Sequence, residues 1–435
     1  MFIVGAYGFC VQFIRRGELF FYCVTDREKS KERERRCMGL NDIPSSERLH
    51  IGFFGRRNAG KSSIVNAVTN QGLSLVSDVA GTTTDPVYKA MELLPLGPVV
   101  IIDTAGFDDE GELGQMRVQS TRKALNRTDI AVLVTDAQVG IGQWERELVE
   151  LFEKKQIPFL IAVNKTDIVS GKVQGENCAY VSAKTGDGIE ELKEKLGALA
   201  DKPGRAARII GDKLERNDLV VLVVPIDESA PKGRLILPQQ QTIRDILDAD
   251  ACAVVVKDTE LGDTLKTLGK KPRLVITDSQ AFASANRQTP PGIMLTSFSI
   301  LMARYKGFLD TAVEGAAAID RLKNGDRVLI SEGCTHHRQC GDIGTVKIPG
   351  WLKKHTGMEI DISTTSGREF PDDLSQYSLV IHCGGCMLTP REMSLRMKCA
   401  SDQDVPFTNY GVAIAHMTGI LKRSVEIFPH LYNKL

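Results

Sequence analysis

The chain has 435 residues, of which 42% are hydrophobic and 25% are charged, and its formal net charge at pH 7 is zero. This neutrality argues against a broad electrostatic grip on nucleic acid, and no apolar run approaches the length of a membrane span. At about 150 residues per domain, the length predicts roughly three domains of ordinary globular composition.

The first 37 residues differ from the rest of the chain. An aromatic-rich segment ends at Cys23, and a run of alternating charges follows at 26–36. The segment lacks the basic start of a signal peptide, and its acidic residues argue against an organellar transit peptide. We interpret 1–37 as a non-native or disordered extension upstream of Met38, with a genuine mobile tail as the alternative. We expect a cytoplasmic protein.

A glycine-rich loop follows the apolar run at 51–54 and precedes a helical pattern that begins at residue 63. Residues 55–62 read GRRNAGKS, the G-x-x-x-x-G-K-S pattern of a phosphate loop. The glycines let successive N–H groups face the phosphates, the lysine reaches the β- and γ-phosphates, and the serine hydroxyl completes a Mg²⁺ shell. A strand-to-helix turn that binds nothing is the alternative. The expected nucleotide contacts are Gly55, Asn58, Ala59, Gly60, Lys61, Ser62 and Ser63.

Two further segments predict the Mg²⁺ and γ-phosphate contacts. Within the loop Thr82–Thr84, Thr83 is the best candidate for a switch threonine that caps Mg²⁺ alongside Ser62. A buried-strand run at 99–102 ends in Asp-Thr-Ala-Gly, where Asp103 can hold Mg²⁺ through water and the Gly106 N–H can meet the γ-phosphate. The expected catalytic set is Lys61, Thr83, Asp103 and Gly106.

The base-recognition segments select guanine. Residues 164–167 read Asn-Lys-Thr-Asp after the strand run 159–163, and 182–184 read Ser-Ala-Lys. The Asp167 carboxylate can accept from guanine N1–H and the exocyclic amine together, which adenine does not offer. A backbone N–H of 182–184 serves guanine O6. The expected base contacts are Asn164, Lys165, Asp167, Ser182, Ala183 and Lys184, and the expected ligand is GTP.

This half of the chain resembles the translation-factor-like GTPases of the TrmE/Era group. Phe107 follows Asp-Thr-Ala-Gly, where Ras-like enzymes carry the glutamine that positions water. Asn58 is similar to the asparagine that coordinates K⁺ in potassium-activated members. The resemblance implies that K⁺ replaces an arginine finger and that intrinsic hydrolysis is slow. Alternatively, Asn58 is only a good turn residue.

The patterns predict an α/β chain: a P-loop GTPase domain at 38–205, followed by two further α/β domains with mainly parallel sheets. In the middle block, 206–321, strand-like runs at 218–225, 253–256 and 273–277 alternate with helical patterns at 241–249 and 260–268. Such alternation is typical of βαβ units. The block has no phosphate loop, and we interpret it as a scaffold or dimerisation domain.

The last block, 322–435, holds two clusters of cysteine and histidine. Cys334 and His336 follow a strand run at 327–331, and His382, Cys383 and Cys386 follow another at 379–381. Both clusters lie where a strand ends, the usual ligand side of an open α/β sheet. Three thiolates and a histidine can close a structural zinc site, and three thiolates with an exchangeable position suit a [4Fe–4S] cluster equally. Unligated buried cysteines are the third possibility.

Together with the GTPase motifs, this C-terminal pattern resembles HydF, the GTPase family of [FeFe]-hydrogenase maturation. The likeness covers 38–435 and includes 342–344, Asp-Ile-Gly, and 346–349, Val-Lys-Ile-Pro. It implies a [4Fe–4S] cluster on Cys334, Cys383 and Cys386, with a fourth position open or weakly filled by His336, His382 or a nearby group. Cys340 is at most a spare ligand.

The resemblance also implies a function. The chain would be a GTP-hydrolysing scaffold and carrier that holds a transient diiron CO/CN⁻ precursor and transfers it to apo-[FeFe]-hydrogenase. The implied partners are a second copy in a homodimer, the radical-SAM maturases and the hydrogenase, with neither nucleic acid nor a membrane. The alternative is an RNA-modification or ribosome-assembly GTPase with a structural zinc module.

Overall fold

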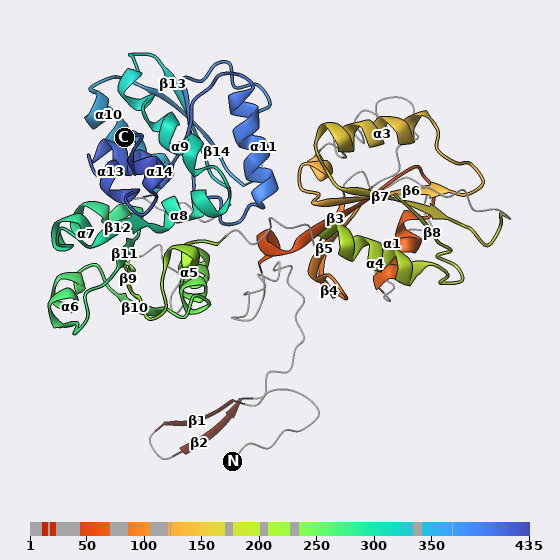
Figure 1. Ribbon diagram of the computed structural model, residues 1–435, viewed down its shortest axis with the longest axis horizontal. Coiled ribbons are helices and arrows are strands. Elements are labelled where there is room, and N and C mark those ends of the chain that lie inside the picture. Colours follow the sequence, from red (N-terminus) through yellow and green to blue (C-terminus); the bar gives the residue numbers. More distant parts are fainter. Residues whose placement is uncertain are drawn as a thin grey trace. The chain divides into compact units, whose positions relative to one another are not determined.

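A computed structural model describes residues 11–15, 18–22, 44–69, 86–104, 121, 123–169, 177–200, 208–226, 235–333, 342–367 and 369–435. Met1–Asp42 forms one compact unit and Ile43–Leu435 another. In the first unit, strands β1 (Val11–Arg15) and β2 (Glu18–Tyr22) pair antiparallel. The second unit contains three further sheets, which follow one another along the chain (Figure 1).

The first of these sheets has six strands in the order β4-β5-β3-β6-β7-β8. Strand β4 is antiparallel to β5, and the other neighbours are parallel. The strands are β3 (Leu49–Phe54), β4 (Val87–Leu93), β5 (Gly97–Asp103), β6 (Ile130–Asp136), β7 (Phe159–Asn164) and β8 (Cys178–Tyr180). The short helix η1 (Ser45–Glu47) precedes β3.

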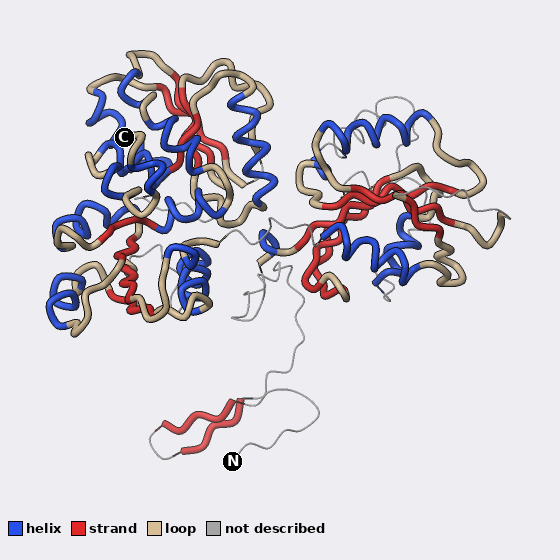
Figure 2. The backbone as a smooth tube through the Cα atoms, viewed as in Figure 1, coloured by secondary structure: helices blue, strands red, loops and turns tan. Residues whose placement is uncertain are grey.

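Helices cover both faces of this sheet, because its central strands are apolar on both sides. Helices α1 (Lys61–Thr69) and α4 (Ile189–Ala200) pack on one face, and α3 (Gln143–Lys154) packs on the other (Figure 2). The adjacent residues Phe53 and Phe54 show the alternation, since they belong to the cores on opposite faces and both are fully buried.

The second sheet is fully parallel, in the order β10-β9-β11-β12. Its strands are β9 (Leu219–Val223), β10 (Cys252–Val256), β11 (Leu274–Thr277) and β12 (Met294–Ser297). The helical segments around it are η2 (Gly211–Lys213), α5 (Leu237–Leu247), α6 (Leu261–Thr267), η3 (Ser279–Ala281), α7 (Phe282–Gln288) and α8 (Phe298–Tyr305).

The third sheet is also parallel, in the order β14-β13-β15-β16. Its strands are β13 (Arg327–Ser331), β14 (Asp361–Thr365), β15 (Leu379–His382) and β16 (Phe407–Asn409). Its helical segments are α9 (Leu309–Ala316), η4 (Ile319–Arg321), a π-helical turn η5 (Ile343–Lys347), α10 (Ile348–Thr356), α11 (Pro390–Ser401), α12 (Tyr410–Met417), α13 (Leu421–Ser424) and α14 (Pro429–Tyr432).

The second and third sheets share one hydrophobic core. Phe308, just before α9, packs edge-on against Phe407 of β16, with ring centroids 5.8 Å apart. Leu301 of α8 and Val412 of α12 belong to the same buried cluster. Continuous apolar packing therefore holds the two C-terminal blocks together.

The predicted fold class is confirmed: an N-terminal P-loop GTPase domain precedes two α/β domains whose sheets are parallel. The predicted domain limits at 38–205, 206–321 and 322–435 remain a proposal. Among the residues that the structure describes, no helix is both long and apolar enough to cross a membrane.

Candidate functional site

Two glycines shape the loop between β3 and α1. Gly55 has φ = +146°, and a Cβ atom there would lie 2.2 Å from the carbonyl oxygen of Val134 on β6. Gly60 has φ = +91°, and its Cβ would lie 2.1 Å from Nδ2 of Asn164 on β7. Both positions combine a conformation that favours glycine with a close approach that excludes a side chain. The neighbouring strands thus hold the curled backbone of a phosphate loop.

Lys61 lies across this loop. Its Nζ donates to the carbonyl oxygens of Gly55 at 3.0 Å and Arg56 at 2.7 Å, and the residue is only 7% exposed. A buried ammonium held by neutral carbonyls binds more strongly to an anion, because the coulombic attraction between opposite charges then adds to the hydrogen bond. The lysine is therefore placed to transfer its hydrogen bonds to phosphate oxygens.

Ser62 and Asp103 form the pair expected at a magnesium site. Ser62 Oγ donates to Asp103 Oδ2 at 2.8 Å, which joins the start of α1 to the end of β5. Burial raises the pKa of Asp103, against the opposing effects of Ser62 and Lys61. Its Oδ1 is buried without a hydrogen-bond partner among the described atoms. A buried acceptor of this kind fits Mg²⁺ with its water shell, since Mg²⁺ prefers carboxylate, hydroxyl and water oxygens.

Asn164 joins the phosphate loop to the base-recognition segments. Its Nδ2 donates to the Ala59 carbonyl at 3.0 Å, and its Oδ1 accepts from the Ala183 N–H at 3.1 Å. The side chain is 2% exposed, so both bonds are protected from water. Three segments that are distant in sequence are thereby fixed in one arrangement.

The predicted guanine contacts lie together at the carboxyl ends of β7 and β8. Asp167 is exposed, and its Oδ1 accepts from Ser182 Oγ at 2.7 Å. Lys165 has φ = +64° and an ion pair of 2.7 Å with Asp136. Lys184 is exposed. A carboxylate held from one side and open on the other is suited to accept two N–H groups of guanine.

Thr83, Gly106 and Phe107 lie outside the described residues. Asn58 and Ser63 are both exposed, and Asn58 adopts a left-handed backbone conformation with φ = 61°. Asparagine tolerates that conformation better than most residues, which accommodates both alternatives for Asn58, a K⁺ ligand and a turn residue.

A comparison of monovalent salts separates the two roles of Asn58. If its amide oxygen binds K⁺ beside the phosphates, Mg²⁺-dependent GTP hydrolysis should be about tenfold or more faster in KCl than in NaCl, because the cation stabilises charge that an arginine finger would otherwise stabilise. Asn58→Asp should keep the left-handed turn and change the salt preference. Equal rates in both salts would leave only the turn role.

The cysteine loop begins at the carboxyl end of β15, beside the end of β13. Ser331 pairs with His382 in the parallel register, and the Cys383 N–H donates to the Ser331 carbonyl at 2.9 Å. Cys383 and Cys386 are both partly buried. The adjacent strand ends therefore bring residue 333, which precedes Cys334, next to the Cys-x-x-Cys segment.

Backbone N–H groups point at the Cys383 sulfur. Gly333 N–H donates to Sγ at 3.1 Å and Gly385 N–H donates at 3.4 Å. Gly385 has φ = +64°, and a Cβ there would lie 2.6 Å from the sulfur of Met393. N–H donors of this kind stabilise a thiolate and adjust the properties of a metal cluster that the thiolate binds.

The loop ends at a capped helix. Thr389 Oγ1 accepts from the Glu392 N–H at 3.1 Å, Glu392 returns a bond to the Thr389 N–H at 3.1 Å, and Pro390 occupies the first turn of α11. This capping box fixes the chain direction just after Cys386. The cysteines are thus held between a buried strand and a rigid helix start.

His382 points into the core of the domain and not toward open solvent; it is fully buried. Arg396 Nη1 lies 2.9 Å from Nε2, and because a guanidinium can only donate, Nε2 accepts. Nδ1 then carries the hydrogen and donates to the Cys383 carbonyl at 2.8 Å. Burial and the Arg396 charge lower the pKa of His382 to about 3. In this arrangement both ring nitrogens are engaged.

Lys306 contributes a charge that the motif analysis missed. Its Nζ donates to the Leu388 carbonyl at 2.8 Å, and burial lowers its pKa to about 8. Burial also raises the pKa of Cys386 to about 11, with Cys383 acting in the same direction and Lys306 opposing both. Thiols in such surroundings need positive charge to ionise, and bound metal ions supply it. No sequence signal links Lys306 to the loop, since they are far apart along the chain.

Cys334, His336 and Cys340 lie outside the described residues. The described part of the site therefore contributes two thiols, the Gly333 N–H beside them and Lys306. This donor set fits a metal centre with sulfur ligands, zinc or iron–sulfur, and the geometry by itself does not choose between them.

Family models decide the identity of the C-terminal half. The hydrogen maturase F dimerization domain matches residues 209–307, and the hydrogen maturase F tetramerization domain matches 310–427. The chain belongs to the hydrogen maturase F family. A third model, described as a 50S ribosome-binding GTPase, matches residues 50–165. The resemblance to HydF with a TrmE/Era-like GTPase half is confirmed, and the two maturase domains support oligomerisation.

Curated relatives match the GTPase half of this family member. GTPase Der of Kosmotoga olearia is 31% identical over 176 residues, which cover 36% of this chain and 40% of Der. The tRNA modification GTPase MnmE of Carboxydothermus hydrogenoformans is 34% identical over 152 residues, or 33% of this chain and 32% of MnmE. The chain thus spans well under half the length of these relatives, and the likeness concerns the P-loop GTPase domain.

Solved structures give weaker likenesses. A probable GTP-binding protein engB aligns with 35% of this chain and 98% of its own, at 25% identity and a TM-score of 0.29. A structure of Era from Aquifex aeolicus bound to GDP·AlF4⁻ aligns with 55% of this chain and 97% of its own, at 16% identity and a TM-score of 0.32.

Proposed function

We propose that this hydrogen maturase F family member hydrolyses GTP and carries a [4Fe–4S] cluster, on which it assembles and delivers the diiron CO/CN⁻ precursor of [FeFe]-hydrogenase. The observation that carries the proposal is the Cys383 sulfur, which accepts N–H groups from Gly333 and Gly385 at the ends of two adjacent strands. The Gly333 N–H bond places the residue before Cys334 beside the Cys-x-x-Cys loop. The same chain also contains a P-loop GTPase domain.

The GTPase residues have separable roles in this proposal. Lys61 leaves the carbonyls of Gly55 and Arg56 to bind the β- and γ-phosphates, and the loop N–H groups bind the same oxygens. Ser62 and Asp103 hold Mg²⁺, Asp103 through water, with Thr83 as the switch ligand and Gly106 at the γ-phosphate. Asp167 selects guanine, while Asn164 keeps its segment in register with the loop.

The cysteine loop would hold the cluster through Cys334, Cys383 and Cys386. A cluster bound in this way supplies one exchangeable iron position. His336 or a nearby group is the simplest occupant of that position, because His382 would first have to give up its hydrogen bond from Arg396. Gly333 and Gly385 orient the Cys383 thiolate, and Lys306 balances negative charge near Cys386.

The remaining parts of the proposal concern assembly and partners. The dimerization-domain match at 209–307 supports a homodimer. Radical-SAM maturases would supply the diiron precursor, apo-[FeFe]-hydrogenase would receive it, and the nucleotide state would time both contacts. K⁺ would assist hydrolysis at Asn58, and the setting would be the cytoplasm.

Anaerobic metal analysis tests the cluster directly. The full chain, reconstituted with iron and sulfide, should be brown, should contain about four irons and four sulfides per chain at the cluster, and should give the EPR signal of a reduced [4Fe–4S] centre. The RNA-modification or ribosome-assembly alternative has a structural zinc in the same cysteines. A colourless protein that retains zinc and takes up no sulfide would support that alternative and overturn the carrier proposal.

A further inference from the structure

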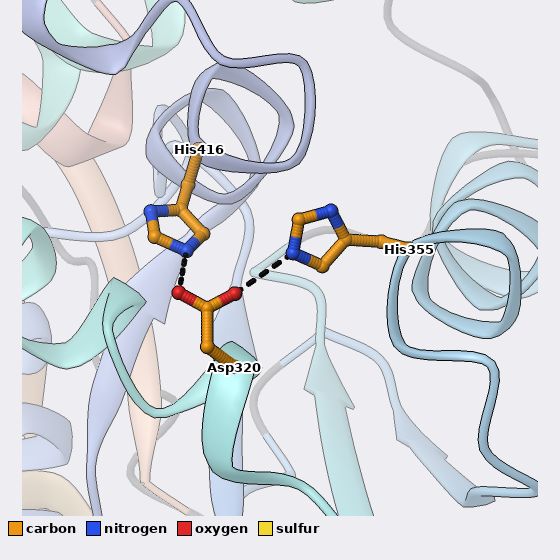
Figure 3. A group of neighbouring side chains, drawn as sticks. All are labelled: Asp320, His355 and His416. Atoms are coloured by element: carbon orange, nitrogen blue, oxygen red, sulfur yellow. Dashed lines mark hydrogen bonds and ion pairs between the residues drawn. The ribbon is translucent and has the colours of Figure 1, made fainter.

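A second group of metal-ligand side chains lies away from the cysteine loop. Asp320 comes from η4, His355 from the end of α10 and His416 from the end of α12, and the three point toward one another (Figure 3). We call them the aspartate–histidine cluster. Their nearest ligand atoms all lie within 4.8 Å of one another.

Both histidines use the same carboxylate. His355 Nε2 lies 2.8 Å from Asp320 Oδ1, and His416 Nε2 lies 2.9 Å from Asp320 Oδ2. The two rings have centroids 5.9 Å apart. Since the carboxylate only accepts, each Nε2 carries a hydrogen in this arrangement. A cation that replaces these two hydrogens would meet two imidazole nitrogens and one carboxylate oxygen.

The spacing suits a small transition-metal ion. With zinc–ligand bonds of about 2.0–2.1 Å, the ligand atoms of a tetrahedral site lie roughly 3.3 Å apart, so small side-chain rotations suffice. The Asp320 side chain is 54% exposed, whereas those of His355 and His416 are 29% and 20% exposed. An ion held there keeps a side open to water, and two histidines with one carboxylate are an established ligand set.

The backbone that carries the three side chains is already fixed. Ile319, Ile348, Leu352 and Ala413 are buried in one hydrophobic cluster, so η4, α10 and α12 share a core. The ligands therefore do not need to be gathered from mobile segments, and less conformational entropy is lost when a metal binds. The pKa of Asp320 is lowered, first by the hydrogen bond from His355, so the carboxylate is ionised as a metal ligand must be.

The cluster is separate from the cysteine loop. Cys383 follows the carboxyl end of β15, whereas Asp320 precedes β13 and His355 precedes β14. These strands are parallel, so the two groups belong to opposite ends of the strands of one sheet. An ion on the aspartate–histidine cluster would tie the ends of α10 and α12 together without using any thiol.

We propose that Asp320, His355 and His416 form a second metal site of this chain, which binds a divalent transition ion, Zn²⁺ in the first place, with water completing the shell. The alternative is a pair of surface hydrogen bonds, and exposed ion pairs of that type contribute little to stability. An exposed histidine–carboxylate pair without a second histidine occurs in the same domain, between His430 and Asp310 at 3.4 Å. It is the matched control.

The test compares Zn²⁺ binding to the full chain and to single variants by equilibrium dialysis, with Co²⁺ absorption as the second readout. Wild type and His430→Gln, which keep the whole aspartate–histidine cluster, should bind one more Zn²⁺ ion per chain than His416→Gln and His355→Gln. If the two cluster variants still bind that ion, their affinity for it should be at least about tenfold lower. The Co²⁺ lost in the variants should have the weak visible bands of nitrogen and oxygen ligation, not the intense bands of thiolates.

Two further measurements keep the test independent of folding and of the cluster. Without Zn²⁺, the unfolding midpoint of His416→Gln should stay close to that of wild type, which shows that the chain is folded, and His355→Gln on a different helix repeats the test if the first variant is unstable. Zn²⁺ should raise the unfolding midpoint of wild type and of His430→Gln only. Equal Zn²⁺ stoichiometry, affinity and midpoint shift in all the proteins would overturn the second site.

Discussion

Cys383→Ser should lose most of its iron–sulfur cluster and still hydrolyse GTP. The substitution removes the sulfur that accepts N–H groups from Gly333 and Gly385, and loss of a metal ligand should lower cluster occupancy at least about tenfold. The phosphate loop uses residues of a different sheet, so the GTP hydrolysis rate should stay within about twofold of wild type. Iron and sulfide content and visible absorption measure the loss of the cluster. Single-turnover hydrolysis measures the GTPase rate.

The control for this variant is Cys399→Ser. Cys399 is a partly buried cysteine of the same domain, on α11, and its sulfur donates toward the carbonyl oxygens of Pro371 and Asp372. The Cys399→Ser variant should keep a full iron–sulfur cluster. If Cys399→Ser and Cys383→Ser lose iron equally, the loss reflects general damage to the domain and not removal of a ligand.

Lys61→Ala should show the opposite pattern, with GTP turnover reduced on the order of a hundredfold or more and the cluster retained. The ammonium is the charged donor of the loop, and removing one preorganised donor from a developing anion costs about 3–4 kcal/mol. The carbonyls of Gly55 and Arg56 would also lose the hydrogen bonds that Lys61 gives them. Hydrolysis rates and the EPR signal of the reduced cluster measure the two effects.

Lys193→Ala is the matched control for Lys61→Ala. Lys193 is also a buried lysine of the GTPase domain, but it pairs with Glu190 on α4 at 2.7 Å. Its removal should change stability slightly and leave turnover near that of wild type. A loss of turnover as large as that of Lys61→Ala would mean that hydrolysis is sensitive to any charge change in the domain.

The sequence predicted elements well where local pattern and environment agree. The buried runs at 218–225 and 273–277 became β9 and β11, because fully buried parallel strands are continuously apolar. The apolar stretch 292–302 contains β12 and the start of α8. Ser297 marks the change, since its side chain accepts from the Ile300 N–H at the start of the helix. Periodicity cannot distinguish the two within one apolar run.

The candidate site was predictable where one short segment carries the chemistry. The phosphate loop and the Cys-x-x-Cys segment are of this kind. Lys306 and Arg396 were not predictable, because they reach the cysteine loop only through tertiary packing. The aspartate–histidine cluster is an extreme case: its members lie on three helical segments, and a lone histidine in a sequence is usually not a ligand.

The central claim, that the chain carries hydrogenase precursor on its cysteine loop, is tested most directly by hydrogen evolution from apo-[FeFe]-hydrogenase. The hydrogenase is incubated with the radical-SAM maturases and either wild-type chain, Cys399→Ser, Cys383→Ser or Lys61→Ala. Wild type and Cys399→Ser should activate it, and the other two should not, because carriage needs the cluster and timing needs the nucleotide. Full activation by Cys383→Ser would contradict the account and favour a zinc-bearing GTPase.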